Sequence, residues 1–134
     1  MACTDTSFAS MFDVKIIEGD KNNFIRDKNS IVLTQSLASK IFGKVSALHK
    51  MLALYTDDST TIYAAVSNVI ADLPKTSHLQ VEGLLPIPEN FGGELADNYG
   101  VLLGPTYLQL KPGVDINALD AKLSNTIHAK KSIY

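Results

Sequence analysis

Residues 31–43 read I-V-L-T-Q-S-L-A-S-K-I-F-G, and they form the most clearly defined structural unit of the chain. The first four residues are a short, mainly apolar run with three β-branched members, which predicts a buried strand. Thr34 or Ser36 can cap a helix that follows at once, and Gly43 is typical of a helix C-terminus. The stretch therefore predicts a strand that leads directly into a helix, whose apolar face consists of Leu37, Ala38, Ile41 and Phe42.

The segments before this unit are short. Residues 4–12 predict one short helix, and residues 13–20 (D-V-K-I-I-E-G-D) alternate in polarity and end in a turn, as a short strand does. Residues 21–30 are polar and rich in turn-forming side chains. We expect Phe24 and Ile25 to anchor that loop on the core.

The segments after it predict further strands. Residues 51–56 and 61–73 flank the turn-forming D-D-S-T and predict a β-hairpin. Residues 78–85 (H-L-Q-V-E-G-L-L) alternate as a strand with one solvated face does. Prolines and glycines throughout residues 86–105 predict a loop. An alternating run followed by a helical pattern then predicts a second strand–helix unit at residues 106–128.

Together these segments predict an α+β fold. We expect a mixed or antiparallel sheet with helices near 36–42 and 116–128 packed on one side, the second helix being capped by Asp115. A length of 134 residues predicts one domain over residues 1–134, with a loop-rich insert at about 86–105. The predicted core consists of Phe12, Ile16, Val32, Leu37, Ile41, Phe42, Val66, Val69, Leu79, Leu108, Leu119 and Leu123.

Composition excludes several classes of function. The chain is 46% hydrophobic and 19% charged, with a net charge of −2 and both signs interspersed, as in an ordinary globular domain. It has no stripe of Lys and Arg, so nucleic-acid binding has little support. The single cysteine, Cys3, allows no internal disulfide. No run approaches the roughly 18 apolar residues of a membrane helix, and no signal peptide is visible.

The stretch D-L-P-K-T-S-H-L-Q at residues 72–80 brings an acid, a hydroxyl and a histidine close together in sequence. A small hydrolase would use Asp72, Ser77 and His78, but catalytic triads usually unite distant segments, and no nucleophile elbow is present. Pro74 disfavours a helical conformation before it, and the neighbouring oxygens can bond turn amides. We therefore favour a structural turn over a loop that contacts a partner, and either of these over catalysis.

No other cluster predicts chemistry. His49 and His128 lie far apart and lack the spacing of metal ligands. Asp57 and Asp58 are explained by a hairpin tip, because the alternating ligands of a calcium loop are missing. The glycine pair in residues 89–94 lacks the strand, helix and lysine of a phosphate-binding loop. The sequence thus predicts no catalytic residue, no cofactor and no metal ion.

Three motifs in order resemble a known family. They are F-A-S-M-F-D-V-K-I-I-E-G-D at 8–20, N-S-I-V-L-T-Q-S-L-A-S-K-I-F-G-K at 29–44 and N-V-I-A-D-L-P-K-T-S-H-L-Q at 68–80. They resemble the extracytoplasmic core domain of MacB/FtsX-like ABC transporter permeases of the Bacteroidetes type. The sequence departs from that pattern in V-S-A-L-H-K at 45–50, in Asn68 where the family has glycine, and in a shorter stretch at 86–105.

The resemblance implies a function without bond chemistry. Such a domain lies on the extracytoplasmic, periplasmic face of the inner membrane and transmits the work of a cytoplasmic ABC ATPase to efflux, lipoprotein extraction or activation of an outer partner. The implied partners are that ATPase, through the parent permease's membrane helices, and a periplasmic adaptor or lipoprotein. The parent would be a homodimer, whereas this chain would be an excised soluble piece that can be monomeric.

One surface and one alternative complete the expectations. Phe91 and Leu95, in the loop at 86–105, are the candidate residues for contact with a partner. The alternative to a transporter domain is a free-standing module that binds a small molecule or a protein, with the same loop as its ligand mouth.

Overall fold

The computed structural model describes residues 1–25, 27–55, 60–88 and 105–131, with side chains as far as residue 126. The chain separates into two units, Met1–Pro88 and Glu89–Tyr134. The first unit contains a sheet and two short α-helices, and the second contains one longer helix. The prediction that residues 1–134 form one domain stays a prediction.

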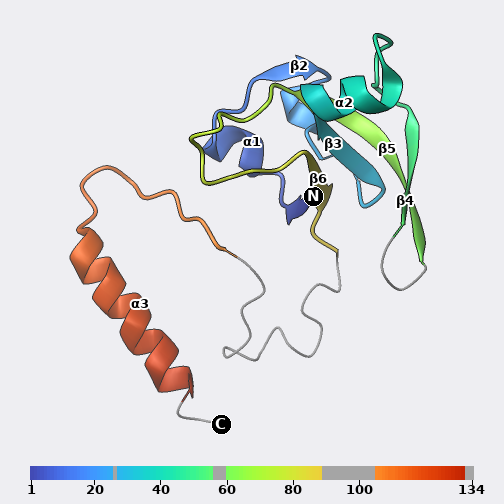
Figure 1. Cartoon of the computed structure of the whole chain (residues 1–134). Helices are drawn as coiled ribbons and strands as arrows, with labels where there is room; N and C mark the ends of the chain where they lie inside the picture. Colours follow the sequence, from blue (N-terminus) through green and yellow to red (C-terminus); the bar gives the residue numbers. More distant parts are fainter. Residues whose placement is uncertain (26, 56–59, 89–104, 132–134) are drawn as a thin grey trace. The chain divides into compact units, whose positions relative to one another are not determined.

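A mixed, open sheet of six strands is formed by the described residues of the first unit (Figure 1). The strand order is β1-β6-β3-β5-β2, and β4 pairs with β5 off this path. β3 is parallel to β5 and antiparallel to β6, β1 is parallel to β6, and both β2 and β4 are antiparallel to β5. The predicted α+β class is confirmed. The strands are β1 (Ala2–Thr4), β2 (Ile16–Glu18), β3 (Ser30–Thr34), β4 (Met51–Tyr55), β5 (Thr61–Ile70) and β6 (Gly83–Pro86).

Strand β3 lies in the interior of the sheet, and all five of its residues are buried. Its side chains alternate between two cores, because successive residues of a strand point to opposite faces. Val32 belongs to the first core cluster, whereas Ile31 and Leu33 belong to the second core cluster on the other face. A strand covered on both faces has a continuous apolar sequence, which explains why I-V-L-T indicated a buried strand.

Helix α2 (Gln35–Phe42) begins and ends where the sequence predicts. The Thr34 hydroxyl accepts a hydrogen bond from the amide of Leu37 at 3.4 Å, as an N-cap residue does. Gly43 follows with φ of 68°, a conformation that a residue with a Cβ adopts at a cost. The strand–helix unit at 31–43 is therefore confirmed.

The buried face of α2 is narrower than predicted. Ala38 is buried in the second core cluster, and Leu37 and Phe42 are half-buried against it. Ile41 is 44% exposed, so its prediction as a core residue was wrong. Leu37, Ala38 and Phe42 are the residues of this eight-residue helix that pack on the sheet, and Ile41 stays largely in solvent.

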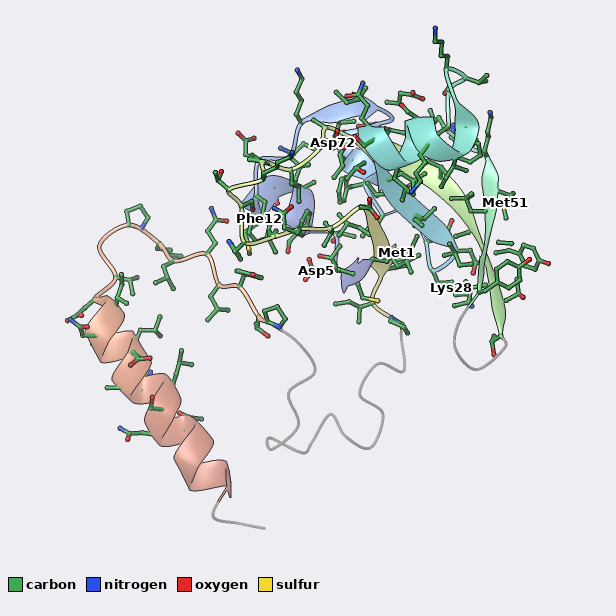
Figure 2. The ribbon with its side chains drawn as sticks, in the orientation of Figure 1. Met1, Asp5, Phe12, Lys28, Met51 and Asp72 are labelled. Carbon is green, nitrogen blue, oxygen red and sulfur yellow. The ribbon has the colours of Figure 1, made fainter. Side chains whose placement is uncertain are left out.

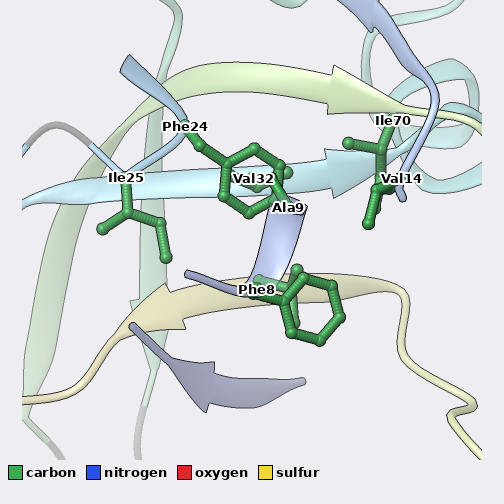
Figure 3. Close-up of a cluster of buried hydrophobic side chains, with 8 residues drawn as sticks. Phe8, Ala9, Val14, Phe24, Ile25, Val32 and Ile70 are labelled. Carbon is green, nitrogen blue, oxygen red and sulfur yellow. The ribbon is translucent and has the colours of Figure 1, made fainter. Parts of the chain in front are cut away.

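The first core cluster lies on the opposite face of the sheet (Figure 3). Short helix α1 (Phe8–Met11) contributes Phe8 and Ala9, and the loop after β2 contributes Phe24 and Ile25, which are buried as predicted. The rings of Phe8 and Phe24 are stacked, with centroids 6.2 Å apart. Since α2 packs on the second core cluster, these two helices cover opposite faces of the sheet.

The predicted hairpin is confirmed: β4 and β5 are antiparallel, from Met51 opposite Ala65 to Tyr55 opposite Thr61. The predicted strand at 78–85 was wrong in its position, because β6 begins only at Gly83. Residues 79–82 keep the predicted alternation of burial, and Leu79 and Val81 pack partly against the first core cluster. These residues do not pair with another strand. Their alternating burial therefore arises from packing against the core and not from membership of the sheet.

The second unit contains helix α3 (Ile116–Lys131). Its predicted cap is confirmed, since the Asp115 carboxylate accepts from the amides of Asn117 and Ala118 at 2.9 and 3.2 Å. The predicted strand at 106–111 was wrong: these residues are irregular, because alternation alone supplies no partner strand. The prediction of Leu108 and Leu123 as core residues was wrong, since they are 63% and 41% exposed. Leu119, also predicted for the core, is only partly buried.

The core can be tested at Leu33, which is fully buried in the second core cluster. We expect Leu33→Ala to lower the free energy of unfolding by about 3 kcal/mol, through lost transfer energy and a cavity. The matched control is Ile41→Ala, which removes a half-exposed apolar side chain and should cost less than about 1 kcal/mol. Urea unfolding measures both, and equal losses would contradict the burial described above.

Candidate functional site

The parallel pairing of β3 and β5 places the ends of both strands side by side, with Thr34 opposite Ile70. The residues that follow therefore meet as well. The Asp72 carboxylate accepts hydrogen bonds from the Ser36 amide at 3.0 Å and from the Ser36 hydroxyl at 2.6 Å. Figure 2 shows Asp72 beside the start of α2. Asp72 thus stabilises the first turn of α2 together with the Thr34 cap.

These contacts lower the pKa of Asp72 below its ordinary value. The hydrogen bond from the Ser36 hydroxyl has the largest effect, followed by the Ser36 amide, with a smaller one from the Thr34 hydroxyl. The carboxylate also lies near the positive end of the helix dipole, which favours the ionised form. Asp72 is therefore a carboxylate held in its charged state by helix α2, and this opposes a role as proton carrier near neutral pH.

The rest of the 72–80 stretch forms a turn of its own. The Ser77 amide donates to the Pro74 carbonyl at 2.8 Å, and the Ser77 hydroxyl accepts from the Leu79 amide at 3.1 Å. The side-chain amide of Gln80 donates to the Pro74 carbonyl at 3.0 Å. His78 is exposed in the same turn. The oxygens of Pro74 and Ser77 are used in closing the chain reversal.

The arrangement separates the three residues that a hydrolase would need. Asp72 is directed at Ser36, and the Ser77 hydroxyl is directed at the backbone of the turn. The expectation that Asp72 would bond amides of its own turn was wrong, because the amide it reaches belongs to a helix 36 positions earlier. No local sequence signal marks Ser36 as its partner, since the contact follows from the register of β3 against β5.

A pocket of about 460 Å³ lies elsewhere, where the loop after β2 meets β5. Asp20 and Asp27 are among its lining residues, and the carboxylate of each accepts a hydrogen bond from an amide of its own loop at 2.9 Å, from Asn22 and Asn29 respectively. Sequence analysis treated these residues only as part of a polar loop. The lining residues are Gly19, Asp20, Asn23, Asp27, Ser30, Leu48, His49, Ala65, Val66 and Ser67.

One wall of the pocket is held by a close approach of Gly19 to Asn68. A Cβ on Gly19 would lie 2.5 Å from Asn68 Nδ2 and 2.8 Å from the Ser67 carbonyl oxygen, and φ is 102°, so this position requires glycine. Asn68 is fully buried, and its Nδ2 donates to the Asp20 carbonyl at 2.9 Å. Its Oδ1 has no hydrogen-bond partner among the described residues. Asn68 therefore connects the core directly to the pocket wall.

Of the remaining sequence candidates, His49 is the one that the described residues place at this pocket. His49 lines the pocket with a left-handed backbone, φ 64°. Asp57, Asp58 and the stretch 89–94 lie outside the described residues, as do the predicted partner contacts Phe91 and Leu95. Among the described residues, no group of three or more His, Cys, Asp or Glu side chains is arranged to hold a metal ion.

Comparison with solved structures gives several matches, two of which are described here. No family model and no curated protein matches this sequence. A crystal structure of a domain assigned to a permease protein of Porphyromonas gingivalis matches with a TM-score of 0.68 and 25% identity, over 96% of this chain and 58% of that chain. The periplasmic region of MacB from Actinobacillus actinomycetemcomitans matches with a TM-score of 0.57 and 12% identity, over 93% of this chain and 53% of that chain.

These matches confirm the resemblance to MacB-like permease domains that the three sequence motifs indicated. At 12% identity, the likeness to the MacB region shows the fold alone. The chain spans little more than half the length of either solved chain. None of the helices in the described part of the chain is long and apolar enough to cross a membrane.

The contact between Asp72 and α2 predicts a specific dependence of stability on pH. A carboxylate whose folded pKa is lowered contributes stability above its unfolded pKa, and this contribution is lost as the pH falls through the folded pKa. We expect Asp72→Asn to lower the free energy of unfolding by about 1 kcal/mol at neutral pH, because the contact is solvent-exposed. The difference from the native chain should shrink towards zero in acid.

The control for this experiment is Glu82→Gln, which removes one negative charge from an exposed side chain. Glu82 accepts the Thr34 amide through its main-chain carbonyl, so the substitution leaves that bond in place. Urea unfolding at several pH values measures both variants. A deficit in Asp72→Asn that is the same at neutral and acid pH would show that ionisation is not the source of the stability.

Proposed function

We propose that this chain is a non-catalytic extracytoplasmic domain of an ABC transporter permease. The observation that carries the proposal is the match over 96% of the chain to a permease domain, at 25% identity and a TM-score of 0.68. The fold shared with the periplasmic region of MacB supports it. The proposed location is the periplasmic face of the inner membrane, as part of a membrane protein whose other segments span the bilayer.

The proposed task is to couple ATP hydrolysis in the cytoplasm to efflux, lipoprotein extraction or activation of a partner outside the membrane. A domain that transmits motion has to move as a rigid body. The interior of the sheet suits this, since β3 is buried on both faces and the helix that follows it is tied to β5 through Asp72. Close-packed interiors transmit strain and do not deform gradually.

The geometry at 72–80 supports the absence of catalysis in this proposal. Asp72 is used in stabilising α2, and the Ser77 hydroxyl accepts a bond within its own turn. The structural roles of Asp72, Pro74, Ser77 and His78 as turn residues are part of the same proposal. The proposed partners are a cytoplasmic ABC ATPase, reached through the parent permease, and an adaptor or lipoprotein on the outside; the parent would act as a homodimer.

The location can be tested directly in cells. We expect the reading frame that encodes this chain to continue into long apolar segments on both sides. Alkaline phosphatase, which is active only outside the cytoplasm, should be active when inserted into residues 86–105 of the whole protein. Activity at the same site of a reporter that works only in the cytoplasm would contradict the transporter proposal. A reading frame without apolar segments would contradict it as well.

Coupling can be tested at the proposed partner contact. In the intact transporter we expect the double substitution Phe91→Ser and Leu95→Ser to reduce transport while ATP turnover continues. The reason is that removing apolar contacts would weaken binding of the outer partner and leave the ATPase unchanged. The matched control is Val45→Ser, which removes an apolar side chain that is 64% exposed in the segment after α2. Unchanged transport in the double variant would remove these two residues from the proposal.

The pocket near Asp20 favours the alternative, a module that binds a small molecule. Its volume of about 460 Å³ falls within the range of ligand sites, and both acidic and apolar residues line it. Its lining residues lie in segments 19–23, 27–30, 48–49 and 65–67, whereas the sequence-based alternative placed the ligand mouth at 86–105. A chain that binds a ligand tightly and whose reading frame lacks membrane segments would favour this alternative.

A further inference from the structure

Strand β4 lies at the margin of the sheet. Within the described part of the chain its one ladder partner is β5, and Figure 1 shows it beside that strand. An edge strand of this kind presents a row of N–H and C=O groups that another strand can pair with. What such a strand pairs with depends on which groups face the edge and on its side chains.

The ladder shows which main-chain groups face the open edge. The amide of Ala65 donates to the carbonyl of Asn29 at 2.7 Å, on the β3 side, although Ala65 stands opposite Met51 in the register. Hydrogen-bonded and non-hydrogen-bonded pairs alternate along an antiparallel ladder. The N–H and C=O groups of Met51, Ala53 and Tyr55 are therefore directed away from β5 and towards the open edge.

The side chains of β4 lack the usual protection of an edge. Its sequence, M-L-A-L-Y, contains no charged residue and no proline, and its register with β5 is unbroken from Met51 to Tyr55. Lys50 and the irregular pairing of His49 and Lys50 with Val66 lie just before the strand. One face is apolar and open to solvent, with Met51 59% and Tyr55 82% exposed, and Tyr63 on the neighbouring strand 62% exposed. Figure 2 shows Met51 on this strand. Natural edge strands usually carry a lysine, a proline or a bulge that prevents pairing.

The same five residues are complementary to themselves. When two copies of β4 run antiparallel with Ala53 opposite Ala53, Met51 of each copy stands opposite Tyr55 of the other. Leu52 then stands opposite Leu54, on the face that packs against the second core cluster. Contacts between a methionine sulfur and an aromatic ring are favourable, and no like charges are opposed. Met51, Ala53 and Tyr55 are also the residues whose main-chain groups face the edge, so each facing pair can exchange two hydrogen bonds.

We propose that β4 pairs with β4 of a second copy of this chain, antiparallel and centred on Ala53, so that the sheet continues across a two-fold axis. Such an interface is isologous, because each copy contributes the same residues. The self-complementary sequence selects a second copy over an extended segment of another protein. The pairing goes beyond the transporter function proposed above and does not rest on it.

Cysteine crosslinking tests the register. Facing Cα atoms of a hydrogen-bonded antiparallel pair are about 5.5 Å apart, within the roughly 4.4–6.8 Å range of disulfides. In a Cys3→Ser background, which removes the exposed native thiol, we expect Ala53→Cys to form a disulfide-linked dimer with oxidised glutathione. The matched control is Met51→Cys, whose two copies would lie at opposite ends of the pairing. Ala53→Cys should crosslink at least about tenfold faster, and equal rates would overturn the proposal.

Sedimentation equilibrium of the native chain tests the pairing itself. We expect a dimer between micromolar and millimolar concentrations, and its loss in Ala53→Lys, because a charge at the centre of the edge opposes its own copy. Tyr63→Lys adds the same charge on β5, one strand away from the edge, and should keep the dimer. Circular dichroism checks that both variants are folded. A native chain that stays monomeric, or a dimer that survives Ala53→Lys, would overturn the proposal.

Discussion

The parallel pairing of β3 with β5 is the constraint on which the rest of the first unit depends. It joins segments about 35 residues apart. Parallel strands need a crossover connection, and here α2 and β4 provide it. The pairing buries β3 on both faces and divides the apolar side chains into two core clusters. It also aligns the ends of the two strands, so that Asp72 meets the first turn of α2.

The pairing is interrupted once, and the interruption has structural effects. Ile31 stands opposite Val66 but Val32 stands opposite Asn68, so Ser67 is an extra residue in β5. The Ser67 hydroxyl donates to the carbonyls of Phe24 at 2.8 Å and Ile31 at 3.3 Å, which supports the bulge and holds the loop after β2. A bulge increases local twist and redirects a side chain. Here it sets Asn68 against Gly19 and so shapes the wall of the pocket.

The features that the sequence predicted correctly are those with local causes. The Thr34 cap, the Gly43 terminus, the Asp115 cap and the hairpin each depend on residues close together in the chain. The errors arose where a distant partner decides the outcome. The alternation at 106–111 lacked a neighbouring strand, and Ile41 found no apolar surface to cover it. The contact of Asp72 with Ser36 depended on a register that no local pattern encodes.

The two partners of β5 differ greatly in their distance along the chain, and this has a kinetic consequence. The hairpin with β4 closes a short connection, which takes microseconds in isolated hairpins. The pairing with β3 has to close a much longer loop before any of its contacts form. Topologies rich in such distant parallel contacts fold slowly. While the hairpin exists without β3, Ala64, Val66 and Val69 are uncovered, so apolar surface stays exposed during the slow step of folding.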